Sequence, residues 1–429
     1  MQVLSASIAV SYEPVKKDCA EAGRSVKAVL GRGLSILEAG RRAQRNRRAC
    51  YVGCRKWNAM RTEYFTLDGS PGDVGKISHA AKLLQAGALV AFPTETVYGL
   101  GADARNVEAL AQLTAVKGRH ESKPYSLLIP SMRHAEAVSG GFSRIAKKLA
   151  RVYWPGPLTL VVPRRGGGTV GLRLPDHPVA RALLARCGFP LATPSANRSG
   201  GAEPVTAQQV REALDGLVAL ILDGGSARQG RPSAVVRVQD EALRVQREGI
   251  IPSGELLETA RPTVLFVCTG NTCRSPMAAG FCRLGIADAH CLAPVGPSMA
   301  AGFDGEGLPV QVLSAGTNAV ENRPADRLAI EVMREAGVDL SSHRSRSLAP
   351  GAVDRADWIF TMTRRQRESI LALMPASAER IQLLSSRNED ITDPEPGSLE
   401  KYRRVRDRIA TCLRDVVKLV GEAVRKGGW

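Results

Sequence analysis

The sequence predicts two α/β domains in succession, the second of them built on a doubly wound parallel sheet. Short apolar runs alternate with helical patterns along most of the 429 residues, and this alternation is typical of a sheet covered by helices. Loops rich in glycine, hydroxyl and basic side chains follow several of these runs. Ligand sites of open α/β sheets lie in such loops, at the carboxyl ends of the strands. The length of the chain is typical of two or three domains.

One stretch organises the second half of the chain. The apolar run Val264–Val267 ends at Cys268, and Arg274 and Ser275 precede an alanine-rich helical segment. We expect a strand, a loop and a helix that begins near Pro276, with Ser275 as its N-cap. The N–H groups of such a loop converge on one spot, where the helix dipole favours an anion and the thiolate form of a cysteine. An arginine fork fits phosphate oxygens, so the stretch predicts attack of a thiol on a phosphate group.

This strand–Cys-x5-Arg-Ser–helix pattern resembles the low-molecular-weight protein phosphatase family, from about Pro262 to the C-terminus. A second hallmark of that family is an Asp-Pro pair in a polar loop, here Asp393-Pro394. The resemblance implies a nucleophile, a phosphate-holding arginine and a general acid, which are Cys268, Arg274 and Asp393. It also implies a phosphate loop formed by Thr269, Gly270, Asn271, Thr272, Cys273 and Ser275. No cofactor or metal is expected for this half.

Thr272 bears on the choice of phosphorylated substrate. Members of the family that act on phosphotyrosine usually have a bulky aliphatic residue there, whereas relatives that act on phosphoarginine have threonine. Glu395 and Pro396 replace the aromatic ring that would pack on phosphotyrosine. We therefore expect a protein phosphatase for phosphoarginine, with phosphotyrosine as the alternative. Thr272 could equally be a loop hydroxyl that contacts no ligand.

The first half carries several polar loops. The pattern of Ala80–Gly87 predicts a helix that ends on a glycine, and Ala88–Phe92 predicts a buried strand. Pro93–Asp103 is expected to be a loop, dense in hydroxyls and glycines, that lets a polar ligand approach the backbone. Lys117–Pro124 places three cations within seven residues, and Pro194–Gly200 is again rich in hydroxyls. Cations and backbone donors of this kind suit a nucleoside triphosphate.

Together these loops resemble the threonylcarbamoyl-adenylate synthase family over about residues 64–255. The resemblance implies a YrdC-like twisted α/β sheet with a concave cleft. It also implies synthesis of L-threonylcarbamoyladenylate from L-threonine, bicarbonate and ATP with Mg²⁺, for a tRNA adenosine modification. The residues implied at the threonine site are Thr96, Arg173, Thr193 and Ser233. Those implied at the ATP site are Lys117, Arg119, Lys123, Thr169, Ser195, Asn197 and Arg247.

A competing interpretation makes the first half an RNA-binding module or another carbamoyl-transfer domain. The formal charge of +17 permits contact with RNA. A related carbamoyltransferase of hydrogenase maturation carries zinc-finger cysteine pairs that this sequence lacks, and Lys117, Arg119 and Lys123 favour ATP. The expected partners are therefore ATP, L-threonine, bicarbonate, a phosphorylated protein and the tRNA threonylcarbamoyl transferase machinery, with tRNA contact as an option.

The domain boundaries follow from these motifs. We expect a basic extension at residues 1–59, a synthase-like domain at 60–255 and a phosphatase-like domain at 262–429. Residues 1–59 hold twelve Lys and Arg against four Asp and Glu; they could be a nucleic-acid arm, a disordered tail or, as we prefer, sequence upstream of a true start at Met60. Residues 286–308 are expected to be a Gly/Pro-rich insertion.

The sequence has no long apolar run, no secretory signal and only nine cysteines. We therefore expect a cytoplasmic protein without a membrane span.

Overall fold

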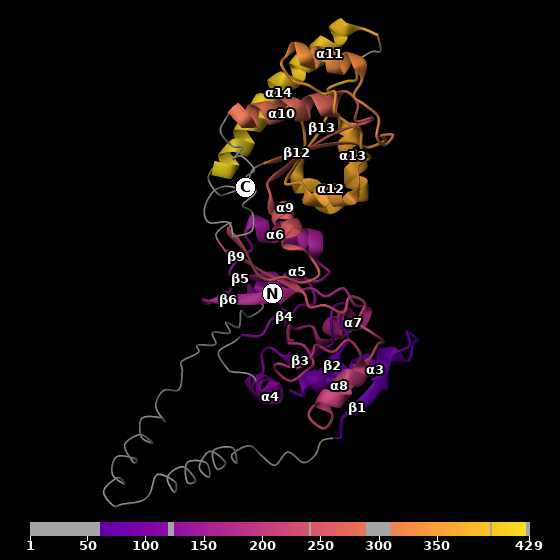
Figure 1. The fold of residues 1–429 in the computed structure, drawn as a ribbon, viewed down its shortest axis with the longest axis vertical. Coiled ribbons are helices and arrows are strands. Elements are labelled where there is room, and N and C mark those ends of the chain that lie inside the picture. Colours follow the sequence, from indigo (N-terminus) through magenta and orange to yellow (C-terminus); the bar gives the residue numbers. More distant parts are fainter. Residues whose placement is uncertain (1–60, 119–123, 240–241, 289–309, 395–396, 426–429) are drawn as a thin grey trace, which may run out of the picture. The chain divides into compact units, whose positions relative to one another are not determined.

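The computed structural model describes residues 61–118, 124–239, 242–288, 310–394 and 397–425 (Figure 1). The predictions for residues 1–59, Arg119, Lys123 and Glu395–Pro396, and for most of the insertion at 286–308, lie outside the described residues. Both halves of the described chain are α/β, so the predicted fold class is confirmed. None of the described helices is both long and apolar enough to cross a membrane.

The first half contains one mixed sheet with the strand order β1-β8-β2-β3-β7-β4-β6-β5-β9-β10. Strands β1 and β2 both run parallel to β8, whereas β3 runs antiparallel to β2 and to β7. The strands are β1 (Glu63–Thr66), β2 (Val90–Phe92), β3 (Gly99–Asp103), β4 (Leu127–Leu128), β5 (Leu158–Pro163), β6 (Thr169–Arg173), β7 (Leu191–Ala192), β8 (Leu220–Asp223), β9 (Ala234–Gln239) and β10 (Ala242–Arg247).

Helices cover both faces of this sheet because successive strand residues point to opposite sides. Val90 and Phe92 of β2 pack with residues of α3 and α7, whereas Ala91 packs with residues of α4 and α8. Around β5 and β9 the core includes α5, α6 and α9. The helices are α3 (Asp73–Gln85), α4 (Val107–Lys117), α5 (Met132–Val138), α6 (Arg144–Tyr153), α7 (Pro178–Cys187), α8 (Ala207–Leu214) and α9 (Ser253–Ala260).

The prediction that Pro93–Asp103 is entirely a loop is wrong for its second part, because Gly99–Asp103 forms the buried strand β3. Its glycines are needed for close packing. A Cβ on Gly99 would lie 2.5 Å from the Thr193 side chain, and one on Gly101 would lie 2.7 Å from the Phe92 ring. A glycine within a strand often marks such a close approach, so Gly99 and Gly101 belong to a tightly packed strand and not to the predicted polar loop.

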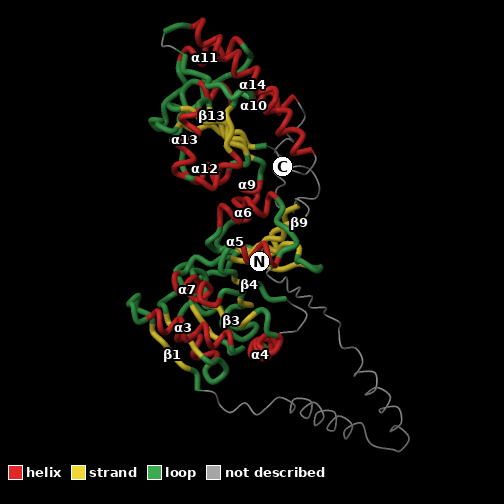
Figure 2. The backbone as a smooth tube through the Cα atoms, turned by 180° about the vertical axis from the view of Figure 1, so that it is seen from behind, coloured by secondary structure: helices red, strands yellow, loops and turns green. Residues whose placement is uncertain are grey.

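The second half is built on a parallel sheet with the order β12-β11-β13-β14. Val264 and Phe266 of β11 pack with α10 and α14, whereas Leu265 and Val267 pack with α12 and α13, so helices cover both faces (Figure 1 and Figure 2). The elements are β11 (Thr263–Cys268), α10 (Arg274–Asp288), β12 (Gln311–Gly316), α11 (Arg327–Glu335), α12 (Pro350–Arg355), β13 (Trp358–Thr361), α13 (Arg364–Leu373), the 3₁₀ helix η1 (Pro375–Arg380), β14 (Ile381–Leu383) and α14 (Leu399–Arg425).

The strand order places the second-half site. The chain leaves β11 for β12 on one side, and β13 lies on the other, so the order reverses at β11. A crevice forms at the carboxyl end of the strand where such a reversal occurs. Cys268 is the last residue of β11, which puts its thiol at this position.

Helix α10 begins two residues earlier than predicted. Its first backbone hydrogen bond runs from Met277 N–H to the Cys273 carbonyl at 3.1 Å, so Cys273 occupies the N-cap position. The prediction that Ser275 is the N-cap is therefore wrong, because this residue lies in the first turn of the helix. Pro276 is accommodated there because N–H groups of a first turn have no partner within the helix. The shift leaves the Ser275 hydroxyl available to the thiol of Cys268.

Candidate functional sites

The thiol of Cys268 is buried and surrounded by donors. Only 2% of the residue is exposed. Its Sγ accepts a hydrogen bond from the Asn271 backbone N–H at 3.2 Å and lies 3.0 Å from Ser275 Oγ. A backbone N–H and a hydroxyl aimed at the sulfur stabilise negative charge there, which is what a nucleophilic cysteine requires.

Asn271 fixes the shape of the loop that follows Cys268. It is fully buried and has a φ of 54°, in the left-handed region that asparagine tolerates better than most residues. Its Nδ2 donates to Ser275 Oγ at 2.9 Å and to Ser314 Oγ at 3.0 Å, and its Oδ1 accepts from Arg346 N–H at 2.8 Å. Its carbonyl accepts from His343 Nε2 at 2.7 Å. One side chain and its peptide thus tie the loop to α10, to β12 and to the 341–347 segment.

The imidazole of His343 is suited to this contact. Burial lowers its pKa, and the positive charges of Arg283, Arg346 and Arg344 act in the same direction, while the hydrogen bond to Asn271 opposes them. The neutral ring still carries the Nε2 proton that the Asn271 carbonyl accepts. His343 therefore supports the loop without adding a fixed charge.

Arg274 and Asp393 meet at this loop. Arg274 is 3% exposed; its Nη1 donates to the Ile391 carbonyl at 2.9 Å, and its Nη2 pairs with the Asp393 carboxylate. Its Nε is buried and has no hydrogen-bond partner among the described residues. A buried donor without a partner is costly, and a phosphate oxygen in the loop would satisfy it. The side chain of Asp393 is 62% exposed. The structure therefore brings together the three residues predicted to be catalytic.

The other predicted loop residues have different surroundings. Thr269 is exposed, and its hydroxyl accepts from Gln366 Nε2 at 3.1 Å. Thr272 is half-buried, with its hydroxyl 3.7 Å from Cys273 Sγ. Burial raises the pKa of Cys273 to about 11, so this thiol stays protonated at neutral pH. Gly270 is half-buried.

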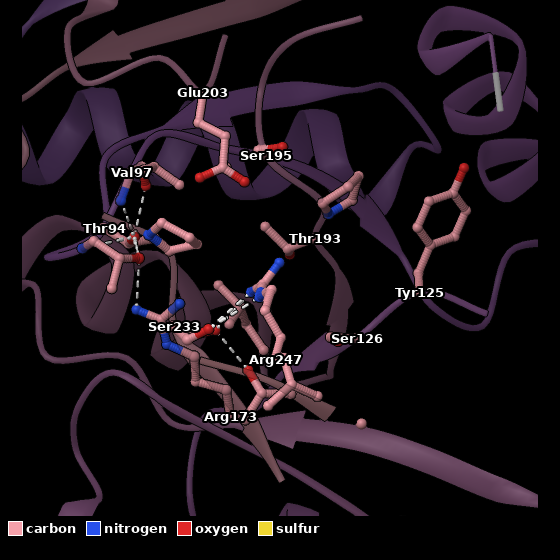
Figure 3. Close-up of a pocket in the computed structure, with 18 of the residues that line it drawn as sticks. Thr94, Val97, Tyr125, Ser126, Arg173, Thr193, Ser195, Glu203, Ser233 and Arg247 are labelled. Carbon is pink, nitrogen blue, oxygen red and sulfur yellow. Dashed lines mark hydrogen bonds between the residues drawn. The ribbon is translucent and has the colours of Figure 1, made fainter. Parts of the chain in front are cut away.

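The first half contains a polar cavity of about 610 Å³ (Figure 3). This volume lies within the range of small-molecule sites. The cavity brings together residues from β3, α4, β6 and the loops after β7 and β8. Every predicted site residue of this half that the structure describes lines it: Thr96, Lys117, Thr169, Arg173, Thr193, Ser195, Asn197, Ser233 and Arg247.

Arg173 is held by a buried acid at one edge of this cavity. Its Nη2 pairs with Glu95 at 2.7 Å and donates to Thr96 Oγ1 at 2.9 Å, and its Nε donates to the Gly156 carbonyl at 3.1 Å. Glu95 is 1% exposed, so the pair is shielded from solvent. The Nη1 group makes no hydrogen bond within the described chain and is available to a carboxylate ligand.

Lys117 shapes the loop that carries two other predicted ATP residues. Its ammonium donates to the Ser195 carbonyl at 2.7 Å, to the Asn197 carbonyl at 2.5 Å and to Asn197 Oδ1 at 2.8 Å. Ser195 Oγ also donates to Asn197 Oδ1 at 2.7 Å. These contacts occupy three donors of the lysine, so in this structure Lys117 fixes the loop from the side of α4.

Arg247 closes the cavity from β10. Its Nε and Nη2 donate to the Ser233 carbonyl at 3.2 and 2.9 Å, and Ser233 Oγ lies 2.9 Å from Thr159 Oγ1. Two arginines, one lysine and several hydroxyls thus face one cavity, an arrangement suited to an anionic, polar ligand.

Sequence reasoning missed the residues that support these sites. These residues contact the predicted ones across long stretches of sequence. Glu95 lies 78 residues from its partner Arg173. The separations from the partner residue are 43 residues for Ser314, 72 for His343 and 97 for Gln366. Glu95 adjoins the predicted Thr96, and this proximity was the one local signal. The others lie in segments without a recognisable motif.

The first half is thus an α/β domain with a cationic, hydroxyl-lined cleft, and the second is an α/β domain with a thiol–arginine loop for anions. Residues 82–249 match the family model described as Telomere recombination (Sua5, YciO and YrdC). Residues 263–426 match the model of the low molecular weight phosphotyrosine protein phosphatases.

Individual proteins agree with these matches. The threonylcarbamoyl-AMP synthase of Bacillus subtilis is 40% identical over 191 residues, which are 42% of this chain and 55% of that protein. The synthase of Chromohalobacter salexigens is 37% identical over 179 residues, 39% of this chain and 96% of that protein. A solved structure of the YwlE arginine phosphatase from Geobacillus stearothermophilus is 32% identical and covers 38% of this chain and 96% of its own, with a TM-score of 0.31.

The chain belongs to the threonylcarbamoyl-AMP synthase family through its N-terminal half, and its C-terminal half is similar to the low-molecular-weight protein phosphatases. The predicted resemblance to both families is confirmed, and both matches are to enzymes. The chain spans about half the length of the B. subtilis relative.

The role of Asn271 gives a prediction with a matched control. Asn271→Ala should lower the free energy of unfolding of the second half by about 2–4 kcal/mol, because several buried hydrogen bonds are lost. Inorganic phosphate should then no longer protect Cys268 from alkylation by iodoacetamide. Asn388→Ala removes another left-handed asparagine (φ 59°), which is exposed, and should cost about 1 kcal/mol or less. Equal losses in denaturant unfolding of the two variants would contradict the role of the hydrogen bonds.

Proposed function

We propose that the N-terminal half makes L-threonylcarbamoyladenylate from L-threonine, bicarbonate and ATP, releases pyrophosphate and supplies a tRNA adenosine modification. We further propose that the C-terminal half is a cysteine-dependent protein phosphatase for phosphoarginine. The first proposal is supported most directly by the convergence of all described site residues on one cavity. The second is supported by Nε of Arg274, next to the loop that follows Cys268, because this buried donor has no partner among the residues that the structure describes.

In the first half the protein mainly orients reactants and neutralises charge. Nη1 of Arg173 binds the threonine carboxylate, and the hydroxyls of Thr96 and Ser233 border the side chain. The amine combines with bicarbonate to give a carbamate and water. A carbamate oxygen then attacks the α-phosphorus of ATP, and pyrophosphate leaves. Mg²⁺ neutralises part of the triphosphate charge when it is bound with the nucleotide.

Arg173 provides the test of this assignment. Arg173→Lys keeps the positive charge beside Glu95 but loses the planar fork, and it should reduce threonine- and bicarbonate-dependent pyrophosphate release by about 100-fold. Arg181→Ala changes an exposed arginine of α7 and should leave the rate unchanged. Melting curves of both variants show whether the fold is kept. An undiminished rate in a folded Arg173→Lys variant would remove Arg173 from the threonine site.

In the second half, the Cys268 thiolate attacks phosphorus and forms a thiophosphate. The loop N–H groups and Arg274 hold the equatorial oxygens. The incoming phosphate competes for the guanidinium of Arg274 and frees the Asp393 carboxylate from its ion pair. This exposed carboxylate takes up a proton from water and passes it to the departing nitrogen or oxygen. Water then cleaves the sulfur–phosphorus bond and frees the cysteine.

Thr272 supports phosphoarginine as the substrate. Its hydroxyl makes one hydrogen bond within the described chain, the weak contact to Cys273 Sγ, so it can accept a hydrogen bond from a guanidinium. Its small side chain also leaves room for that planar group. A larger aliphatic residue would fill the space and favour a flat aromatic ring instead.

This assignment predicts a change of substrate preference. Thr272→Ile should lower the ratio of kcat/KM for phosphoarginine to that for phosphotyrosine peptides by at least about tenfold. Thr272→Ser keeps a small hydroxyl and should retain the wild-type ratio. Wild-type preference for phosphotyrosine, or an unchanged ratio in Thr272→Ile, would refute the phosphoarginine assignment while leaving Cys268 as the nucleophile.

A further inference from the structure

The cavity of the first half contains one acidic side chain among the described residues that line it. This is Glu203, whereas Lys117, Arg173 and Arg247 supply positive charge. Figure 3 shows the Glu203 carboxylate entering the cavity between Val97 and Ser195, at the edge opposite Arg173. A carboxylate in a site otherwise suited to anions requires an explanation.

The backbone on either side of Glu203 is fixed by hydrogen bonds, whereas its own side chain makes none within the described chain. On one side, Asn197 Nδ2 donates to the Gly201 carbonyl at 2.6 Å, and on the other, Tyr98 N–H donates to the Pro204 carbonyl at 2.8 Å. Glu203 is half-buried, and its carboxylate makes no hydrogen bond or ion pair with the part of the chain that the structure describes. The fold therefore presents a positioned acid that has no partner among the described residues.

Glu203 lines the cavity together with the residues assigned to ATP, so it lies near the proposed position of the triphosphate. It follows the loop that carries Ser195 and Asn197, both assigned to ATP, and it lies close enough to act on Arg247. Burial lowers the pKa of Arg247, and the negative charge of Glu203 opposes that effect. Nε and Nη2 of Arg247 donate to the Ser233 carbonyl, and within the described chain they make no hydrogen bond to Glu203. Without a cation between them, the carboxylate and a triphosphate in this cavity would repel each other.

We propose that Glu203 is a protein ligand of the divalent cation that enters with the nucleotide. A hard cation such as Mg²⁺ binds oxygen donors, and in nucleotide sites it commonly takes one or two carboxylates together with phosphate oxygens. Glu203 supplies one such oxygen donor, and the triphosphate supplies the others. This inference rests on the proposed use of ATP by the N-terminal half.

Titration calorimetry of the whole chain with α,β-methylene-ATP tests the inference without turnover. Each protein is titrated in Mg²⁺ and again in EDTA. Glu203→Gln should bind the nucleotide about tenfold more weakly than wild type in Mg²⁺, because a metal ligand is lost. In EDTA the same variant should bind more tightly than wild type, because a repulsive charge is gone. Glu136→Gln makes the same charge change at an exposed position on α5 and should match wild type in both conditions.

The pattern of affinities separates the alternatives. Tighter binding by Glu203→Gln in both conditions would overturn the inference, since Glu203 would then act only by repulsion. Unchanged nucleotide affinity with weaker L-threonine binding would also overturn it, since the carboxylate would then bind the ammonium group of the amino acid. Failure of wild type to bind the nucleotide in either condition would refute the proposed function itself.

Discussion

The phosphate loop depends on the buried side chain of Asn271. The loop between β11 and α10 lies outside regular secondary structure, so other contacts must hold its backbone in place. Asn271 provides this by donating to Ser275 and Ser314 and accepting from the 346 backbone, while its own N–H donates to the thiol. Because Asn271 both shapes the loop and contacts the thiol of Cys268, the fold of this half and its proposed chemistry share one constraint.

Gly316 shows how little space this arrangement leaves. A Cβ at that position would lie 2.4 Å from the Thr269 carbonyl oxygen and 3.0 Å from Asn271 N. The end of β12 thus lies directly against the loop and restricts the position of its backbone at Thr269 and Asn271. Gly316 therefore shapes the loop although it has no side chain.

Both sites combine a rigid frame with a few unsatisfied polar groups. In the second half the frame is the Asn271 network, and Nε of Arg274 is a buried donor without a partner among the described residues. In the first half the buried Glu95–Arg173 pair and the Lys117 contacts form the frame, while Nη1 of Arg173 and the carboxylate of Glu203 have no partner in the described chain. Fixed groups of this kind gain their partners only when ligand binds, so they need little reorganisation during the reaction.

The sequence predicted the second site in more detail than the first. Cys268 and Arg274 lie within one short stretch, so a local strand–loop–helix pattern was enough to place them. The residues of the cleft come from segments spread over 150 positions, and only the family resemblance connected them. Ser314, His343 and Glu203 could not be predicted because their roles depend on contacts made by the folded chain. The prediction of a loop at Gly99–Asp103 was wrong because glycine is favoured both in ligand-binding loops and where a strand packs closely against its neighbours.

We propose that one chain carries two separate active sites with different chemistry. The most direct test measures threonine- and bicarbonate-dependent pyrophosphate release and phosphoarginine hydrolysis on the same preparations of wild type, Cys268→Ser and Arg173→Lys. We predict that Cys268→Ser loses only hydrolysis, because an alcohol at this position stays protonated, and that Arg173→Lys loses only pyrophosphate release. Loss of both activities in either folded variant, or the absence of one activity from wild type, would contradict this account.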